Sequence, residues 1–307
     1  MPIRIPNHLP GRRILEKEGV PLILEERAQR QDIRPLQILI LNLMPDKIGT
    51  ETQLLRSLGS TPLQLDITFM HMASHTSKNT SQEHLAAFYK SHSDISDRNF
   101  DALIVTGAPL GLVDYKDVAY WDELTHIFDW ARTHVYSSLF ICWGALAALY
   151  HFHGVSKHLL NKKKTGIFEH RTLNPSHPIT RGFDDFFYVP VSRSTRIDPI
   201  ALRQRHTIET LIETENNDPC IVHDASLRHL YIFSHLEYDA ETLQNEYERD
   251  KRAGLNPDIP DNYFPNNDPA STPQIIWRAH RTLLFTNWIN TVYQNTPYDL
   301  AELTKCL

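Results

Sequence analysis

The sequence lacks three features that would each assign it to a particular class of protein. Its 307 residues include only three cysteines, Cys142, Cys220 and Cys306, which are too few and too scattered for a disulfide framework or a zinc site. No segment approaches the roughly 20 consecutive apolar residues of a membrane span. The net charge is −6, so no excess of positive charge favours nucleic acid or an anionic membrane surface. We therefore expect a soluble protein that binds neither nucleic acid nor a membrane.

The N-terminal part of the chain differs from the rest in its pattern. Residues 1–11 contain prolines and arginines but no apolar core of a signal peptide, which predicts a cytoplasmic protein. We expect residues 1–34 to form an arm that packs on the body or on a partner subunit, and such an arm favours a homodimer. Residues 35–307 are expected to form a single α/β domain, for which a hydrophobic content of 41% is ample.

Strands and helices alternate along the first half of the chain. Apolar runs at residues 36–41 and 102–105 and alternation at 65–70 predict strands, whereas residues 48–58 and 121–135 have helical spacing. This alternation predicts a mostly parallel sheet with helices on both faces. In such sheets, ligands bind beyond the carboxyl ends of the strands.

The second half carries fewer clear signals. Residues 221–223 and 230–233 are predicted to be strands, and residues 237–253 a charged helix. Residues 256–272 are rich in Pro, Asn and Asp, which is typical of a loop. The final helix is predicted to pack through one apolar face, formed by Ile276, Ala279, Leu283, Leu284, Trp288 and Val292.

A cysteine stands where a buried strand meets a helix. The apolar run that ends at Ile141 predicts a strand, and residues 145–149 form helix readily. Cys142 would then lie at the positive end of the new helix, where backbone N–H groups lack partners. The helix dipole and these N–H groups both favour the thiolate, which is the nucleophilic form. The alternative interpretation is a small buried apolar residue, the usual role of free cysteine.

A nucleophilic cysteine requires a base, an orienting group for that base, and donors for an oxyanion. His235 and Glu237 follow a predicted strand, and in extended backbone their side chains would point to the same face. The alternative is an ordinary surface pair. The N–H of Trp143 is one candidate oxyanion donor, and the loop Gly107–Gly111, including Leu110 and Gly111, could supply a second. That loop could equally be an ordinary strand-to-helix turn.

With these motifs the chain resembles the homoserine O-acyltransferases that open methionine biosynthesis. The matching segments are Phe140–Gly144, Gly107–Gly111, His235 with Glu237, Asn42–Lys47 with Glu51–Gln53, Gly166–Phe168, Tyr188–Ser192 and Asn262–Pro265. The resemblance covers nearly the whole chain. It implies a flavodoxin-like α/β fold of the type found in class I glutamine amidotransferases, whose cysteine turn and His-x-Glu pair are similar.

The resemblance implies a two-step acyl transfer. Cys142 would attack the thioester of an acyl-CoA, and His235, held by Glu237, would then activate the γ-hydroxyl of L-homoserine. It also implies that the family's substrate contacts fall on Lys163, Ser192 and Arg249. From the residues alone, Lys163 could be merely solvated, Arg249 could pair with a neighbouring acid, and Ser192 carries no signal. We expect no metal, because His71, His75 and His84 are not at ligand spacing, and no tightly bound cofactor.

The resemblance links the acyl donor to position 111. In the family a glutamate there goes with acetyl-CoA, whereas Gly111 leaves room and adds no charge, which favours succinyl-CoA. The expected product is therefore O-succinyl-L-homoserine. The alternatives are a homoserine O-acetyltransferase, a glutamine amidohydrolase with the same triad, or a non-catalytic metabolite-binding protein of this fold.

Overall fold

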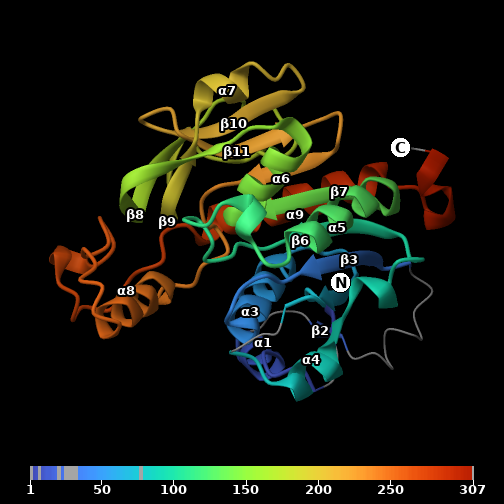
Figure 1. The fold of residues 1–307 in the computed structure, drawn as a ribbon, viewed down its shortest axis with the longest axis horizontal. Coiled ribbons are helices and arrows are strands. Elements are labelled where there is room, and N and C mark those ends of the chain that lie inside the picture. The colour runs from blue at the N-terminus through green and yellow to red at the C-terminus, as the bar shows by residue number, and fades with distance from the viewer. Residues whose placement is uncertain (1–2, 6–7, 19–21, 24–33, 76–78, 306–307) are drawn as a thin grey trace.

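One continuous sheet forms the centre of the molecule (Figure 1). The computed structural model describes residues 3–5, 8–18, 22–23, 34–75 and 79–305. Within them the sheet has 12 strands in the order β2-β1-β4-β3-β6-β7-β12-β11-β10-β8-β9, with β5 beside β4. Cys306 and much of the predicted arm lie outside the described residues.

The sheet has a parallel part and an antiparallel part. The parallel strands are β1 (Ile3–Arg4), β2 (Leu22–Ile23), β3 (Leu36–Leu41), β4 (Leu65–Met70), β5 (Tyr89–Lys90), β6 (Phe100–Val105), β7 (Val135–Ile141) and β12 (His229–Ile232). The antiparallel strands are β8 (Lys157–Thr172), β9 (Phe186–Ile197), β10 (Ile208–Thr214) and β11 (Pro219–Asp224).

Helices cover both faces of the parallel part. The described α-helices are α1 (Arg12–Lys17), α3 (Lys47–Leu58), α4 (Gln82–Phe88), α5 (Trp121–His134), α6 (Trp143–His153), α7 (Pro199–Arg203), α8 (Thr242–Arg252) and α9 (Arg278–Asn295). Short 3₁₀ helices are η1 (His92–Asp94), η2 (Tyr115–Asp117), η3 (Pro265–Asn267) and η4 (Leu300–Lys305). The predicted mostly parallel α/β sheet with helices on both faces is therefore confirmed.

Strand β3 shows why the central strands are apolar along their whole length. Ile38 and Ile40 pack in the core layer that contains α3 and α9, while Leu39 and Leu41 pack in the layer that contains α5 and α6. Successive side chains of a strand point to opposite faces, so a strand covered on both sides needs an apolar residue at each position.

The last two long helices differ in part from the prediction. Helix α8 begins at Thr242 rather than at residue 237, because the backbone N–H of His235 donates to the carbonyl of Pro190 in β9 (2.8 Å) and the chain stays non-helical there. Helix α9 begins at Arg278, so Ile276 precedes it and is 55% exposed. Ala279 is also exposed, whereas Leu284, Trp288 and Val292 are buried as predicted.

The long ribbon of β8 and β9 is not predicted by the sequence pattern. It pairs over most of its length, with Lys157 opposite Ile197 and Arg171 opposite Phe186. A loop that follows α8 is bound to its edge through the backbone of Asp261, which bridges Gly166. At Gly166, φ is +142°, and a Cβ atom would lie 2.2 Å from the carbonyl oxygen of Asp261, so only glycine fits without a shift.

The described parts of the N-terminal segment contact the body. Strand β1 pairs with β4, and Glu18 after α1 forms an ion pair with Arg56 of α3. Packing of residues 1–34 on a partner subunit, and the single domain over 35–307, stay predictions. Within the residues that the structure describes, no helix combines the length and hydrophobicity needed to cross a membrane.

Candidate active site

Cys142 occupies a tight turn between β7 and α6. Its backbone has φ 50° and ψ −113°, a conformation that side-chain-bearing residues rarely adopt. The amide of Cys142 donates to the carbonyl of Ile232 (2.7 Å), which ties the turn to β12. At Gly144, a Cβ atom would lie 2.6 Å from the carbonyl oxygen of Thr106, so the first turn of α6 packs closely on the end of β6. Cys142 itself is half-buried, as a nucleophile that must meet a substrate requires.

The structure brings Cys142, His235 and Glu237 together. Nδ1 of His235 lies 2.7 Å from Oε1 of Glu237, and Cys142 lies close enough to act on the charge of the same imidazole. His235 and Glu237 are buried, at 4% and 7% exposure. Burial opposes a charge on the imidazole, but Glu237 and Cys142 outweigh it and raise the pKa of His235 well above its ordinary value. The arrangement has the order nucleophile, base and orienting carboxylate.

The ring of Tyr238 packs on the imidazole of His235, and Trp277 in turn holds Tyr238. The two rings stack with their centroids 4.0 Å apart and their planes 18° from parallel. Trp277, which is fully buried, donates from its indole nitrogen to the carbonyl of Tyr238 (3.0 Å). The ring of His235 therefore has few orientations open to it, which is what a proton-transfer group requires.

The loop Gly107–Gly111 begins beside Cys142. A Cβ atom on Gly107 would lie 3.3 Å from Cβ of Cys142. The amide of Leu110 donates to the carbonyl of Ala108 (2.8 Å), so of the two loop amides proposed as oxyanion donors, that of Leu110 already has a partner. Trp143 is the first residue of α6, where its N–H has no acceptor within the helix.

A second group of side chains comes from the antiparallel ribbon and α8. Oγ of Ser192 in β9 donates to Glu246 (2.5 Å), and Nζ of Lys163 in β8 lies 3.3 Å from the same carboxylate. The hydroxyl of Tyr238 donates to the other oxygen of Glu246 (2.9 Å). Burial works to raise the pKa of Glu246, but Lys163, Ser192 and the neighbouring groups outweigh it and hold that pKa below its ordinary value. Glu246 thus connects Tyr238, whose ring stacks on His235, to two of the predicted substrate contacts, Ser192 and Lys163.

Arg249 lies at the outer end of this group. Both of its hydrogen bonds go to Asp250 (2.7 and 2.9 Å), and its side chain is 62% exposed. Asp250 also pairs with Lys163 (3.3 Å). The structure thus brings Lys163, Ser192 and Arg249 into one network, with Glu246 and Asp250 as the acids between them. Nothing in the sequence pattern distinguished Glu246 from the other acids of a charged helix.

The segment Asn42–Lys47 packs against the loop Gly107–Gly111. Lys47 is buried, and its Nζ donates to the carbonyl oxygens of Asn42 (2.7 Å) and Met44 (3.4 Å). Burial lowers the pKa of Lys47 to about 8. The sulfur of Met44 would lie 3.9 Å from a Cβ atom on Gly107, so this turn packs directly against the candidate oxyanion loop.

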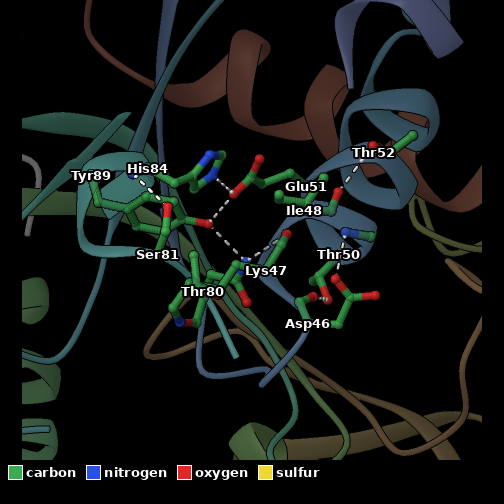
Figure 2. Close-up of polar contacts among 12 residues, drawn as sticks. Asp46, Lys47, Ile48, Thr50, Glu51, Thr52, Thr80, Ser81, His84 and Tyr89 are labelled. Carbon is green, nitrogen blue, oxygen red and sulfur yellow. Dashed lines mark hydrogen bonds and ion pairs between the residues drawn. The ribbon is translucent and has the colours of Figure 1, made fainter. Parts of the chain in front are cut away.

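Figure 2 shows the polar network behind this turn. The amide nitrogen of Asn42 donates to the hydroxyl of Tyr89 (2.9 Å), which in turn donates to Glu51 (2.6 Å). Nε2 of His84 lies 2.9 Å from the same oxygen of Glu51. The contacts join α3, α4 and β5, and they connect Glu51 to the segment Asn42–Lys47. Within the part of the chain that the structure describes, no group of three or more His, Cys, Asp or Glu side chains could hold a metal ion.

Comparison with known proteins identifies relatives over almost the full length. A family model described as "HTS: Homoserine O-succinyltransferase" matches residues 2–298. A homoserine O-acetyltransferase of Hyphomonas neptunium is 50% identical over 303 residues, covering 99% of each chain. A homoserine O-acetyltransferase of a Chelativorans species is 48% identical over 307 residues, covering 100% of this chain and 98% of its own.

Solved structures show the same architecture in more distant proteins. A glutamine amidotransferase from Thermotoga maritima superposes with a TM-score of 0.54 at 10% sequence identity, covering 85% of this chain and 98% of its own. At that identity the likeness concerns the fold alone. The expected class I glutamine amidotransferase-like fold is thereby confirmed.

Proposed function

The chain belongs to the homoserine O-succinyltransferase family, and on that premise we propose that it transfers a succinyl group from succinyl-CoA to the γ-hydroxyl of L-homoserine. Membership makes it an acyltransferase and is consistent with a role in methionine biosynthesis. The observation that carries the proposed mechanism is the contact of His235 with both Cys142 and Glu237 in a buried site.

In the first step, the sulfur of Cys142 attacks the thioester carbonyl of the donor. The tetrahedral intermediate collapses, the bond to the sulfur of CoA breaks, and His235 protonates the departing thiolate. The acyl group is then held as a thioester of Cys142, which costs little free energy because one thioester replaces another. The N–H groups of Trp143 and Gly111 are the proposed donors to the oxyanion, and Leu110 could join them only by releasing Ala108.

In the second step, the γ-oxygen of homoserine attacks the acyl-enzyme. His235 takes the proton of that hydroxyl, Glu237 stabilises the resulting imidazolium, and the sulfur of Cys142 leaves. CoA and homoserine occupy the same side of the acyl carbon one after the other, because the imidazole of His235 protonates the first and deprotonates the second.

The second group of side chains is suited to bind the ends of homoserine. Glu246 offers a carboxylate for the α-ammonium group, and Lys163 and Arg249 offer cations for the α-carboxylate. Ser192 lies against Glu246 and can hold either group. In the unliganded structure, these charges pair with one another, so binding would exchange internal ion pairs for ion pairs with the substrate.

Two donors remain to be distinguished, because the family description says succinyl whereas the similar relatives are named acetyltransferases. Gly111 supports succinyl-CoA. A side chain at this position would approach the buried Thr195 of β9 (3.8 Å from Cβ), so glycine leaves space in front of that strand. The acetyltransferase names support acetyl-CoA as the second candidate.

Intact mass spectrometry of the purified protein tests both proposals. Mixed with each acyl-CoA in the absence of acceptor, the protein should gain one succinyl group, and homoserine should remove it. Cys142→Ala should abolish the gain, whereas Cys220→Ala should retain it because the side chain of Cys220 is fully buried and cannot meet an acyl donor. Faster labelling by acetyl-CoA would overturn the succinyl assignment, and labelling of Cys142→Ala would overturn the mechanism.

A further inference from the structure

We propose that Lys157, together with the hydroxyl of Thr195, forms the subsite that binds the free carboxylate of the acyl donor. This inference rests on the proposed function, because it assigns the recognition of a dicarboxylic acyl group to named residues. Both side chains come from the β8–β9 ribbon, and both reach the loop that contains Gly111.

Lys157 holds the two sides of that loop. Its Nζ donates to the carbonyl oxygen of Leu110 (3.4 Å) and to that of Val113, the residues on either side of Gly111 and Leu112. The loop starts against Cys142, where Gly107 nearly touches the nucleophile, and reaches Lys157 a few residues later. One loop therefore connects the surroundings of Cys142 to Lys157.

Thr195 completes the surroundings of Gly111. In the ribbon, Lys157 lies opposite Ile197 and Leu159 lies opposite Thr195. Residues directly opposite one another, and residues two apart in a strand, share a face, so Lys157 and Thr195 lie on one face of the ribbon. A cation and a hydroxyl on one face, beside a glycine, form a combination that suits a carboxylate.

Lys157 differs from other lysines of β8 because it has no acidic partner in an ion pair. Lys163 forms ion pairs with Glu246 and Asp250, and Lys162 pairs with Asp258. Among the described residues, Lys157 forms no ion pair. Its partners are two carbonyl oxygens and the ring of Tyr115, 4.7 Å from Nζ.

The charged groups that line the cavity beside Lys157 leave one positive charge unmatched. This cavity of about 350 Å³ is lined by Lys157, the exposed Lys116 and the exposed Asp114, together with Leu112 and Tyr115. Burial lowers the pKa of Lys157, and Asp114 only partly opposes this effect. Two lysines therefore share one acid in the cavity. A bound carboxylate would supply the missing counter-charge.

The test compares donors that differ only in the carboxylate. Butyryl-CoA has the chain length of succinyl-CoA, with a methyl group in place of the carboxylate. The rate of Cys142 acylation is measured in a single turnover, without homoserine, for the wild-type enzyme and for Lys157→Gln. We expect Lys157→Gln to lose about 10- to 100-fold with succinyl-CoA, because a charge-assisted hydrogen bond is removed, and to change by less than about threefold with butyryl-CoA.

Three variants sharpen this test. Lys157→Arg should recover part of the succinyl-CoA rate, because the charge is restored. Thr195→Val, which keeps the shape of the side chain, should lose about three- to tenfold with succinyl-CoA alone. Lys162→Gln is the matched control, since Lys162 is an exposed lysine of the same strand that lies outside this cavity, and it should leave both rates unchanged.

The outcomes separate the inference from the proposed function. If Lys157→Gln lowers the acylation rate equally with both donors, Lys157 only supports the loop and the inference is wrong. If it keeps the succinyl-CoA rate, the carboxylate binds elsewhere and the inference is again wrong. If the wild-type enzyme itself reacts no faster with succinyl-CoA than with acetyl-CoA, the proposed donor is wrong, and this result is visible before any variant is made.

Discussion

The candidate site has two halves that are held by different interactions. The nucleophile half, formed by β6, β7 and α6, is held by backbone hydrogen bonds and apolar packing: the amide of Cys142 bonds to Ile232, and Gly144 packs on Thr106. The acceptor half, formed by β8, β9 and α8 (Figure 1), is held by a chain of charged side chains that includes Lys163, Glu246 and Asp250.

This difference matches what each half would have to do. A nucleophile has to stay fixed to within fractions of an ångström, and main-chain hydrogen bonds in a packed core provide such rigidity. A binding site for a zwitterion has to offer charges that can exchange partners when the substrate arrives. Ion pairs near the surface contribute little net stability, so they can be exchanged at low cost. Variants in the nucleophile half should therefore change kcat, and variants in the acceptor half should change KM for homoserine.

The largest effect is expected for Glu237→Gln. Glu237 is counted with the nucleophile half because it holds His235, the proposed base for Cys142. The change should lower kcat by about 10³- to 10⁴-fold with little change in KM, because the imidazole of His235 loses the group that orients it and stabilises its cation. Glu241→Gln, an exposed acid a few residues later, is the control. Steady-state kinetics against homoserine would contradict the assignment if KM rose while kcat held.

The same variant gives a pH test. Because Glu237 contributes to the raised pKa of His235, its loss should lower that pKa. His235 acts in the second step as a base, so kcat rises with pH as the imidazole loses its proton. The rising limb of the pH profile of kcat should therefore move to lower pH in Glu237→Gln. A limb that stays in place would show that another group titrates there.

The next effect is expected in the acceptor half, for Glu246→Gln. Glutamine keeps an acceptor for the hydroxyl of Tyr238 but removes the charge proposed to bind the α-ammonium group. KM for homoserine should rise about 10- to 100-fold, and acylation by the donor alone should stay within about threefold. Glu248→Gln on the same helix is the control. Equal loss in both half-reactions would mean that Glu246 acts through Tyr238 on His235, and the division between the halves would fail.

The two halves also differ in how far the sequence alone predicts them. The nucleophile half follows from local patterns: an apolar strand, a cysteine and a helix-forming segment place Cys142, and the alternation of strands and helices predicts the parallel sheet. The pairing of His235 with Glu237 is also visible locally, since a single residue separates them and the strand end is clear. The comparisons confirm the family and fold, while the role of each residue stays a prediction.

The acceptor half is set by contacts between residues far apart in the chain. Ser192 and Glu246 are 54 positions apart, and Lys163 and Glu246 are 83 apart. Strand β8 lacks the apolar alternation that identifies a half-buried strand, because much of it is exposed. In β9 the buried positions alternate, but Arg193 and Thr195 among them are polar. Glu246 resembles the other acids of its helix until the fold places it beside Tyr238. Only the resemblance to a known family pointed to this half, through Lys163, Ser192 and Arg249.

A smaller effect, on stability, is expected where the acceptor half is held by backbone. Gly166→Ala should lower the free energy of unfolding by about 2–4 kcal/mol, because φ is positive and the new Cβ would meet the backbone of Asp261. Gly254→Ala is a matched control, since φ is +73° there but nothing lies within 4 Å of the Cβ position, and it should cost only about 1 kcal/mol. Urea unfolding measures both. Equal losses would show that crowding by Asp261 contributes nothing.

The smallest effect is expected for Arg249→Gln, and it separates a binding residue from a surface charge. The guanidinium is 62% exposed and bonds only to Asp250, so its removal should change the free energy of unfolding by less than about 0.5 kcal/mol. If it binds the α-carboxylate of homoserine, KM should still rise about three- to tenfold, with acylation unaffected. Arg252→Gln, an exposed arginine of the same helix, should leave KM unchanged. Equal KM values for the two variants and the wild-type enzyme would restrict recognition of the α-carboxylate to Lys163, whose position between Glu246 and Asp250 already places it deeper in the network.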